Sequence, residues 1–197
     1  TLLTIPYEIR HMIYLEIPYL KMDQPLVYCT SVFNGRKHHP LSGICRQIRA
    51  EASEIYYSSN TWLIKTEYKM FYDGFVKWIK SLDRYSVQAL RFLHLSLRGP
   101  LFYKSRARPH IHDLELERKF SRAKYSYTTY SIDLSEKYEN GKVEIVSCLG
   151  GREVAVTLKK ILEVHVKGLW EKKAKGEMRA KDVKRVVDEM LEICGWW

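Results

Sequence analysis

The stretch ICRQIRAEASEIYYSSNTW at residues 44 to 62 decides most about the fold of this chain. Its isoleucines and an alanine recur at helical spacing and form one apolar stripe: Ile44, Ile48, Ala52 and Ile55. Polar side chains lie away from that stripe, at Arg46, Gln47, Arg49 and Glu54. The pattern predicts an amphipathic helix with an aromatic-rich end, followed by a strand at residues 62 to 66.

A second stretch, IPYEIRHMIY at residues 5 to 14, predicts a short helix. Thr4 is its expected cap, Pro6 suits the first turn, and Glu8 lies near the positive helix end. The apolar stripes of the two predicted helices are complementary, so we expect them to pack together around Ile9 and Ile48. An ion-pair network that pins the longer helix to its neighbours is expected from Arg46, Arg49, Glu51 and Glu54.

Together these two stretches resemble the F-box-like proteins of filamentous fungi. In that family an Asn-Thr pair and a strand follow, and Asn60-Thr61-Trp62-Leu63-Ile64 matches this pattern. LRFLHLSL, which closes residues 71 to 97, resembles the family's continuation, so the resemblance covers residues 3 to 98. This chain departs from the family in one respect, because residues 18 to 40 intervene between the two helices.

The resemblance implies a non-enzymatic role as a protein-interaction or adaptor module. It also raises the hypothesis that the first helix docks the Skp-type adaptor of cullin ubiquitin ligases. Exposed apolar side chains at helical spacing suit such recognition, and the candidates are Ile5, Pro6, Ile9 and Ile13.

The rest of the chain alternates strand and helix signals. Strands are expected at residues 26 to 33, before the turn Asn34-Gly35, and at 90 to 97, with a helix at 67 to 82 and a loop at 99 to 113. A hairpin is expected from residues 125 to 135 and 142 to 149 around Asn140-Gly141, then helices at 152 to 173 and 179 to 194 that join near Gly176. These elements predict one compact α+β domain over residues 1 to 197, with an F-box-like half (3 to 98) and a basic half (99 to 197).

The net charge of +10 is concentrated in two blocks. Residues 98 to 124 hold eight Lys/Arg against three Asp/Glu, and residues 159 to 185 hold ten against four. Such blocks suit nucleic acid, so the alternative function is a basic nucleic-acid-binding or chromatin-associated protein. Its candidate contacts are Lys104, Arg106, Arg108, Lys124, Tyr125, Tyr127, Lys172, Lys173, Lys184 and Arg185. An acidic protein partner or a solvated face explains the same charges.

The chain holds few signals of catalysis or of a bound cofactor. No nucleophile stands beside a base, and the pairs His38-His39 and His110/His112 have no third ligand at a matching spacing. The expectation is therefore no enzyme, no metal and no cofactor. Widely spaced cysteines predict reduced thiols, and no apolar run predicts a membrane span or signal peptide. We expect a cytoplasmic or nuclear protein. A start at Thr1 instead of methionine is consistent with the removal of an upstream segment.

Overall fold

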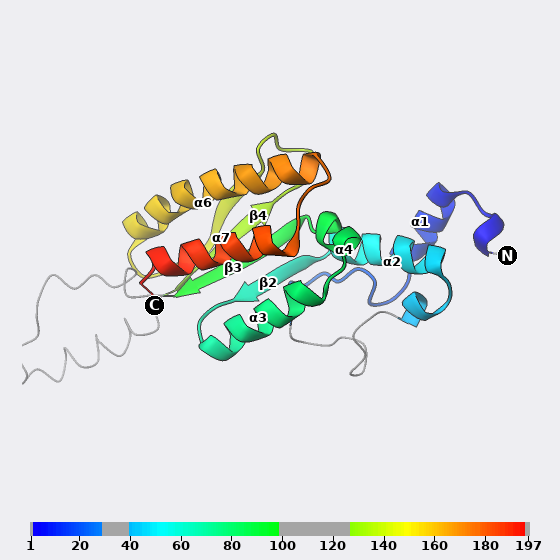
Figure 1. Ribbon diagram of the computed structural model, residues 1–197, viewed down its shortest axis with the longest axis horizontal. Coiled ribbons are helices and arrows are strands. Elements are labelled where there is room, and N and C mark those ends of the chain that lie inside the picture. The colour runs from blue at the N-terminus through cyan, green and yellow to red at the C-terminus, as the bar shows by residue number, and fades with distance from the viewer. Residues whose placement is uncertain (1, 29–39, 99–126, 196–197) are drawn as a thin grey trace, which may run out of the picture.

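The computed structural model describes residues 2–28, 40–98 and 127–195 (Figure 1). The first half contains two 3-10 turns, four helices and three strands: η1 (Leu2–Thr4), α1 (Tyr7–Leu15), β1 (Leu26–Val27), η2 (Pro40–Gly43), α2 (Arg46–Ser59), β2 (Thr61–Lys65), α3 (Lys69–Ser81), α4 (Arg84–Ala89) and β3 (Phe92–Arg98). The second half adds β4 (Tyr127–Asp133), β5 (Lys142–Leu149), α6 (Arg152–Ala174) and α7 (Ala180–Ile193).

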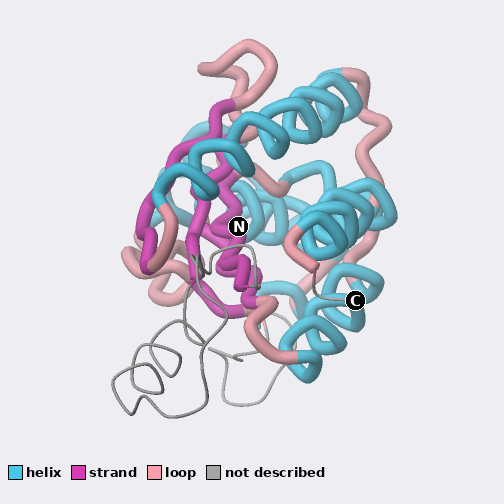
Figure 2. The backbone as a smooth tube through the Cα atoms, turned by 90° about the vertical axis from the view of Figure 1, so that its left-hand side faces the viewer, coloured by secondary structure: helices cyan, strands magenta, loops and turns pink. Residues whose placement is uncertain are grey.

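The five strands form one mixed sheet in the order β1-β2-β3-β4-β5. Strands β1, β2 and β3 run parallel, whereas β3, β4 and β5 are antiparallel neighbours. Helices α3, α6 and α7 lie on one side of the sheet, and the α1–α2 pair extends from one end (Figures 1 and 2). This arrangement confirms the predicted α+β class.

The core lies between the sheet and its three covering helices. Leu93, Leu95 and Leu97 alternate along β3 and are buried, as the pattern of residues 90 to 97 predicts. Tyr130 of β4 is fully buried, and its hydroxyl donates a hydrogen bond of 3.0 Å to the Ala155 carbonyl of α6. Tyr130 therefore joins the sheet to α6.

Helix α2 begins at Arg46, two residues after the first residue of the predicted apolar stripe. Cys45 is the N-cap, and its sulfur accepts a hydrogen bond from the Ile48 amide. The stripe residues inside the helix are buried, but Ile44 precedes the cap and is 60% exposed. The expectation for Ile44 is therefore wrong, because a residue outside the helix does not follow its 3.6-residue period.

The segment between the two N-terminal helices is part of the domain. Asn60, which follows α2 and has no exposed surface, donates to the carbonyls of Leu20 and Tyr56, each at 2.8 Å. Its side-chain oxygen accepts from the Met22 amide at 2.7 Å. Both N–H donors and the oxygen of this buried amide are thus hydrogen-bonded, and Asn60 ties residues 20–22 to the end of α2.

Helices α3, α6 and α7 and strands β2 to β5 occur where the sequence predicts them. In the hairpin connection, Asn140 and Gly141 have positive φ values of 69° and 75°, in a backbone region that asparagine and glycine adopt more readily than other residues. Helix α4 was not predicted; Asp83 caps it by accepting from the Ser86 amide at 2.7 Å. Strand β1 is shorter than predicted within the described residues, while the Asn34-Gly35 turn and the 99–113 loop lie outside them.

Candidate interaction site on the N-terminal helix

A buried ion pair joins α1 to α2. The guanidinium of Arg10 contacts both oxygens of the Glu51 carboxylate, with Nε to Oε2 at 2.9 Å and Nη2 to Oε1 at 2.5 Å. Only 7% of the Arg10 side chain and 11% of the Glu51 side chain are exposed. Arg10 also donates to the Ile5 carbonyl, so it holds the chain that enters α1 as well as the helix itself. The bidentate contact fixes the orientation of α1 on α2.

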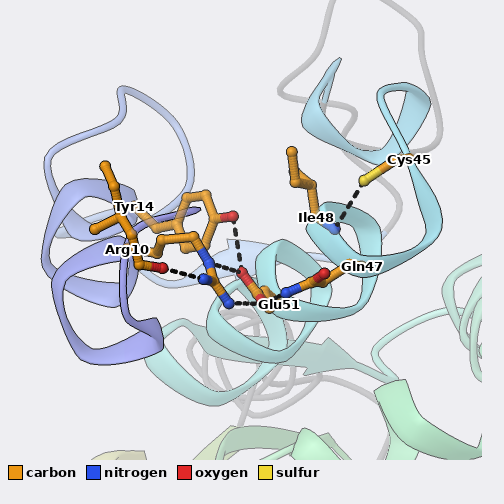
Figure 3. Close-up of polar contacts among 7 residues, drawn as sticks. Arg10, Tyr14, Cys45, Gln47, Ile48 and Glu51 are labelled. Atoms are coloured by element: carbon orange, nitrogen blue, oxygen red, sulfur yellow. Dashed lines mark hydrogen bonds and ion pairs between the residues drawn. The ribbon is translucent and has the colours of Figure 1, made fainter. Parts of the chain in front are cut away.

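Two further side chains donate hydrogen bonds to the Glu51 carboxylate (Figure 3). The hydroxyl of Tyr14 donates to Oε2 at 2.9 Å, and the side-chain amide of Gln47 donates to Oε1 at 3.0 Å. Hydrogen bonding from Arg10, supported by Gln47 and Tyr14, lowers the pKa of Glu51 to about 2 despite its burial. Burial and the bond to Glu51 raise the pKa of Tyr14 to about 12. At neutral pH the pair is therefore fully ionised, with Tyr14 protonated as a donor.

The opposite side of α1 faces outward and carries apolar side chains beside the exposed Glu8. Ile9 is 47% exposed and Met12 is 63% exposed, and the other large exposed apolar side chains between Leu2 and Leu20 are Leu3, Tyr7, Ile13 and Tyr19. Pro6 is also exposed, and Ile5 is half-buried. The four residues predicted to bind a partner thus lie at the start and along the outward side of α1. Tyr7 is exposed too, but it lies on the inward side, where its ring is 5.9 Å from the Arg10 guanidinium. We call Ile9, Met12 and Ile13 the α1 apolar face.

Three expectations about this region are wrong in whole or in part. Pro6, not Thr4, is the N-cap of α1, and it provides no side-chain hydrogen bond because proline has no polar side-chain atom. The helices pack through Arg10 and Tyr14 rather than around Ile9, which faces outward. Glu51 pins α2 to a neighbouring helix, as expected, but its ion-pair partner is Arg10 of α1, 41 residues away, and not an arginine of its own helix.

Three of the four candidate contacts in the second basic block, Lys172, Lys173 and Lys184, are used inside the fold. Lys172 forms an ion pair with the buried Asp182 at the start of α7, and Lys184 forms one with Asp188 along α7. The Arg185 side chain is 62% exposed and lies 3.8 Å from Glu189. These lysines therefore carry less uncompensated charge than the sequence alone indicates.

Lys173 is held by backbone oxygen atoms instead of a carboxylate. Its ammonium donates to the Leu90 carbonyl at 2.7 Å and to that of Gln88, so it joins α6 to the end of α4. Burial, with a smaller effect of Arg91, lowers the pKa of Lys173 to about 8. A half-buried ammonium bonded in this way supports the fold and does not point at an external phosphate.

Tyr127 is half-buried at the start of β4. The remaining candidates for nucleic-acid contact, Lys104, Arg106, Arg108, Lys124 and Tyr125, lie outside the described residues, as do His38, His39, His110 and His112. Within residues 2–28, 40–98 and 127–195, no three His, Cys, Asp or Glu side chains are grouped to hold a metal ion. Over the same ranges, no helix combines the length and apolar character of a membrane span.

Comparison of the chain with models of protein families, with curated protein sequences and with solved structures gives no match. The resemblance to F-box-like proteins therefore stays a prediction from the two N-terminal stretches. What the structure adds is their geometry, with one helix fixed by a buried ion pair and presenting its apolar side outward.

Proposed function

We propose that this chain is a non-enzymatic protein-interaction module of F-box-like type, and that α1 docks the Skp-type adaptor of cullin ubiquitin ligases. The observation that carries the proposal is the α1 apolar face. A nine-residue helix that leaves two isoleucines, a methionine and a tyrosine exposed departs from the usual pattern, in which such side chains are turned inward.

The attachment of α1 to α2 supports a docking role for this face. Its inward side uses Arg10 and Tyr14 to bind Glu51, so the helix is held in place without burying its isoleucines. A helix held in advance loses little conformational freedom when a partner binds, and more of the contact energy then contributes to affinity. Recognition of an amphipathic helix in an apolar groove uses residues spaced in this way.

The charge of this region favours a protein partner over nucleic acid. Between Leu2 and Leu20 the only lysine or arginine is Arg10, and Glu51 neutralises it. Phosphate backbones are bound chiefly through exposed lysine and arginine, which the α1 apolar face does not offer. The cytoplasm or nucleus, where such ligases work, is the compartment that fits this proposal.

The proposal is tested by measuring adaptor binding to matched surface variants. Met12 and Met70 are both exposed helical methionines, at 63% and 72%, on α1 and α3 respectively. In calorimetric titrations with a purified Skp-type adaptor, Ile9→Asp and Met12→Asp should each weaken binding by about tenfold or more, because a charge replaces an apolar contact. Met70→Asp should bind like the unmodified chain. Absence of binding at micromolar concentrations, or equal weakening by Met70→Asp, would contradict docking through α1.

A further inference from the structure

A hollow of about 520 Å³ lies between the outer side of α6 and the β-hairpin, remote from α1. Figure 1 shows the β4–β5 connection beside α6. At that end Gly141 packs so closely on the helix that a Cβ there would lie 2.8 Å from the Cγ1 atom of Val166. The turn is therefore held against α6 and forms a fixed wall of the hollow, which we call the β5–α6 hollow.

Six charged side chains line this hollow, four of them lysines. Its two carboxylates are already engaged, because Lys142 lies 2.7 Å from Glu144 and Lys159 lies 3.2 Å from Glu163. The other two lysines, Lys160 and Lys167, are exposed and have no ion pair with any described residue. The hollow thus has a surplus of two positive charges, which both come from α6.

The spacing of these two lysines indicates the kind of anion that fits. Lys160 and Lys167 are seven residues apart, which is about two helical turns or roughly 10 Å along the axis. They lie on the same side of the helix, with the 71% exposed Val164 between them. Flexible four-carbon stems allow two ammonium groups at this separation to reach neighbouring anionic groups of one ligand.

We propose that the β5–α6 hollow binds a small anion that carries two or more linked phosphate groups, with Lys160 and Lys167 as its main contacts. The volume falls in the range of small-ligand sites. The residues that line the hollow include no aromatic side chain, so it lacks the stacking surface that single-stranded nucleic acid uses. A compact oligophosphate satisfies both lysines without such a surface.

The test uses tripolyphosphate, which has linked phosphates but no base or lipid, titrated calorimetrically into the full chain at about 0.15 M salt. The double variant Lys160→Gln plus Lys167→Gln should bind about tenfold or more weakly, because two charge-assisted contacts are lost. The matched control is Lys175→Gln plus Lys181→Gln, which removes the same charge from exposed sites outside the hollow. It should change affinity by about twofold at most.

Two comparison ligands separate a site from general attraction. Inorganic phosphate should bind more weakly than tripolyphosphate. The two double variants should bind a random single-stranded oligonucleotide with equal affinity. Absence of saturable tripolyphosphate binding, or equal loss in both double variants, overturns the proposal. Oligonucleotide binding that is tighter than that of tripolyphosphate and lost only in the Lys160/Lys167 variant also overturns it, in favour of a nucleic-acid contact.

Discussion

Replacement of Asn60 by alanine should destabilise the domain although it removes no apolar contact. Asn60 is fully buried and makes three hydrogen bonds, to the carbonyls of Leu20 and Tyr56 and to the amide of Met22. Each lost bond leaves a buried or half-buried partner without its hydrogen bond, at about 1 kcal/mol apiece, so Asn60→Ala should cost about 3 kcal/mol. For a chain of 197 residues this corresponds to a fall in Tm of about 6–12 °C.

Urea and thermal unfolding measure this loss, and hydrogen exchange of the Met22 amide locates it. Exchange should be much faster in Asn60→Ala, because the carbonyl-type oxygen that protects this amide is gone. The adjacent Ser59→Ala is the matched control, since no hydrogen bond of the Ser59 side chain is found among the described residues, and its effect should stay within about 0.5 kcal/mol. A fall in Tm under about 2 °C with unchanged Met22 protection would refute the assignment of Asn60 as an anchor.

Other predictions concern acid stability, the core and the hairpin. The pKa of Glu51 is about 2 in the folded chain and 4.5 ordinarily, so its ionised form stabilises the fold fully above pH 4.5, and this stabilisation is lost as the pH falls from about 4.5 to 2. Glu51→Gln should remove this part of the pH dependence of Tm. In urea unfolding, Ile48→Asp should lower the free energy of unfolding by about 4 kcal/mol, whereas Ile44→Asp at an exposed position should lower it by less than about 0.5 kcal/mol. Similar losses in the two variants would contradict the placement of the helix start. Gly141→Ala should lower the free energy of unfolding by about 1–3 kcal/mol, because Gly141 has a positive φ and packs closely on α6. Gly43→Ala should be nearly neutral, since a Cβ there would meet no atom within 4 Å. Equal stabilities of the two variants would refute the tight turn.

Much of the fold follows from local sequence pattern. The alternation of Leu93, Leu95 and Leu97 marks β3, and the Asn140-Gly141 pair marks the hairpin, because both signals depend only on nearby residues. The two C-terminal helices have long periodic stretches with a glycine between them, so their boundaries fall close to prediction. The parallel pairing of β1 with β2 joins distant segments, and no local signal specifies it.

The candidate site was harder to predict, because its geometry depends on a contact between distant residues. Pairing rules within one helix cannot assign Arg10 as the partner of Glu51. One signal was present: Glu51 lies three residues after Ile48 and four before Ile55, so its carboxylate is on the apolar side of α2. A carboxylate there requires a cation and further donors from a neighbouring element, and α1 supplies both.

The outward direction of Ile9 has the same origin. An apolar stripe on a short helix predicts burial, but the inward position on α1 is occupied by Arg10 and Tyr14, whose polar atoms reach Glu51. The bidentate ion pair therefore determines which side of α1 faces α2. Ile9 and Ile13 are left exposed, which is the feature on which the proposed function rests.

Oxidation of methionine in the presence and absence of the adaptor tests the central claim most directly. Met12 on α1 and Met70 on α3 are both well exposed, so mild peroxide should oxidise both in the free chain at similar rates. Peptide mass spectrometry then reports each site separately. We predict that saturating Skp-type adaptor protects Met12 and leaves Met70 as reactive as before. Equal oxidation of the two methionines at saturating adaptor, or protection of Met70 alone, would contradict an interaction through α1.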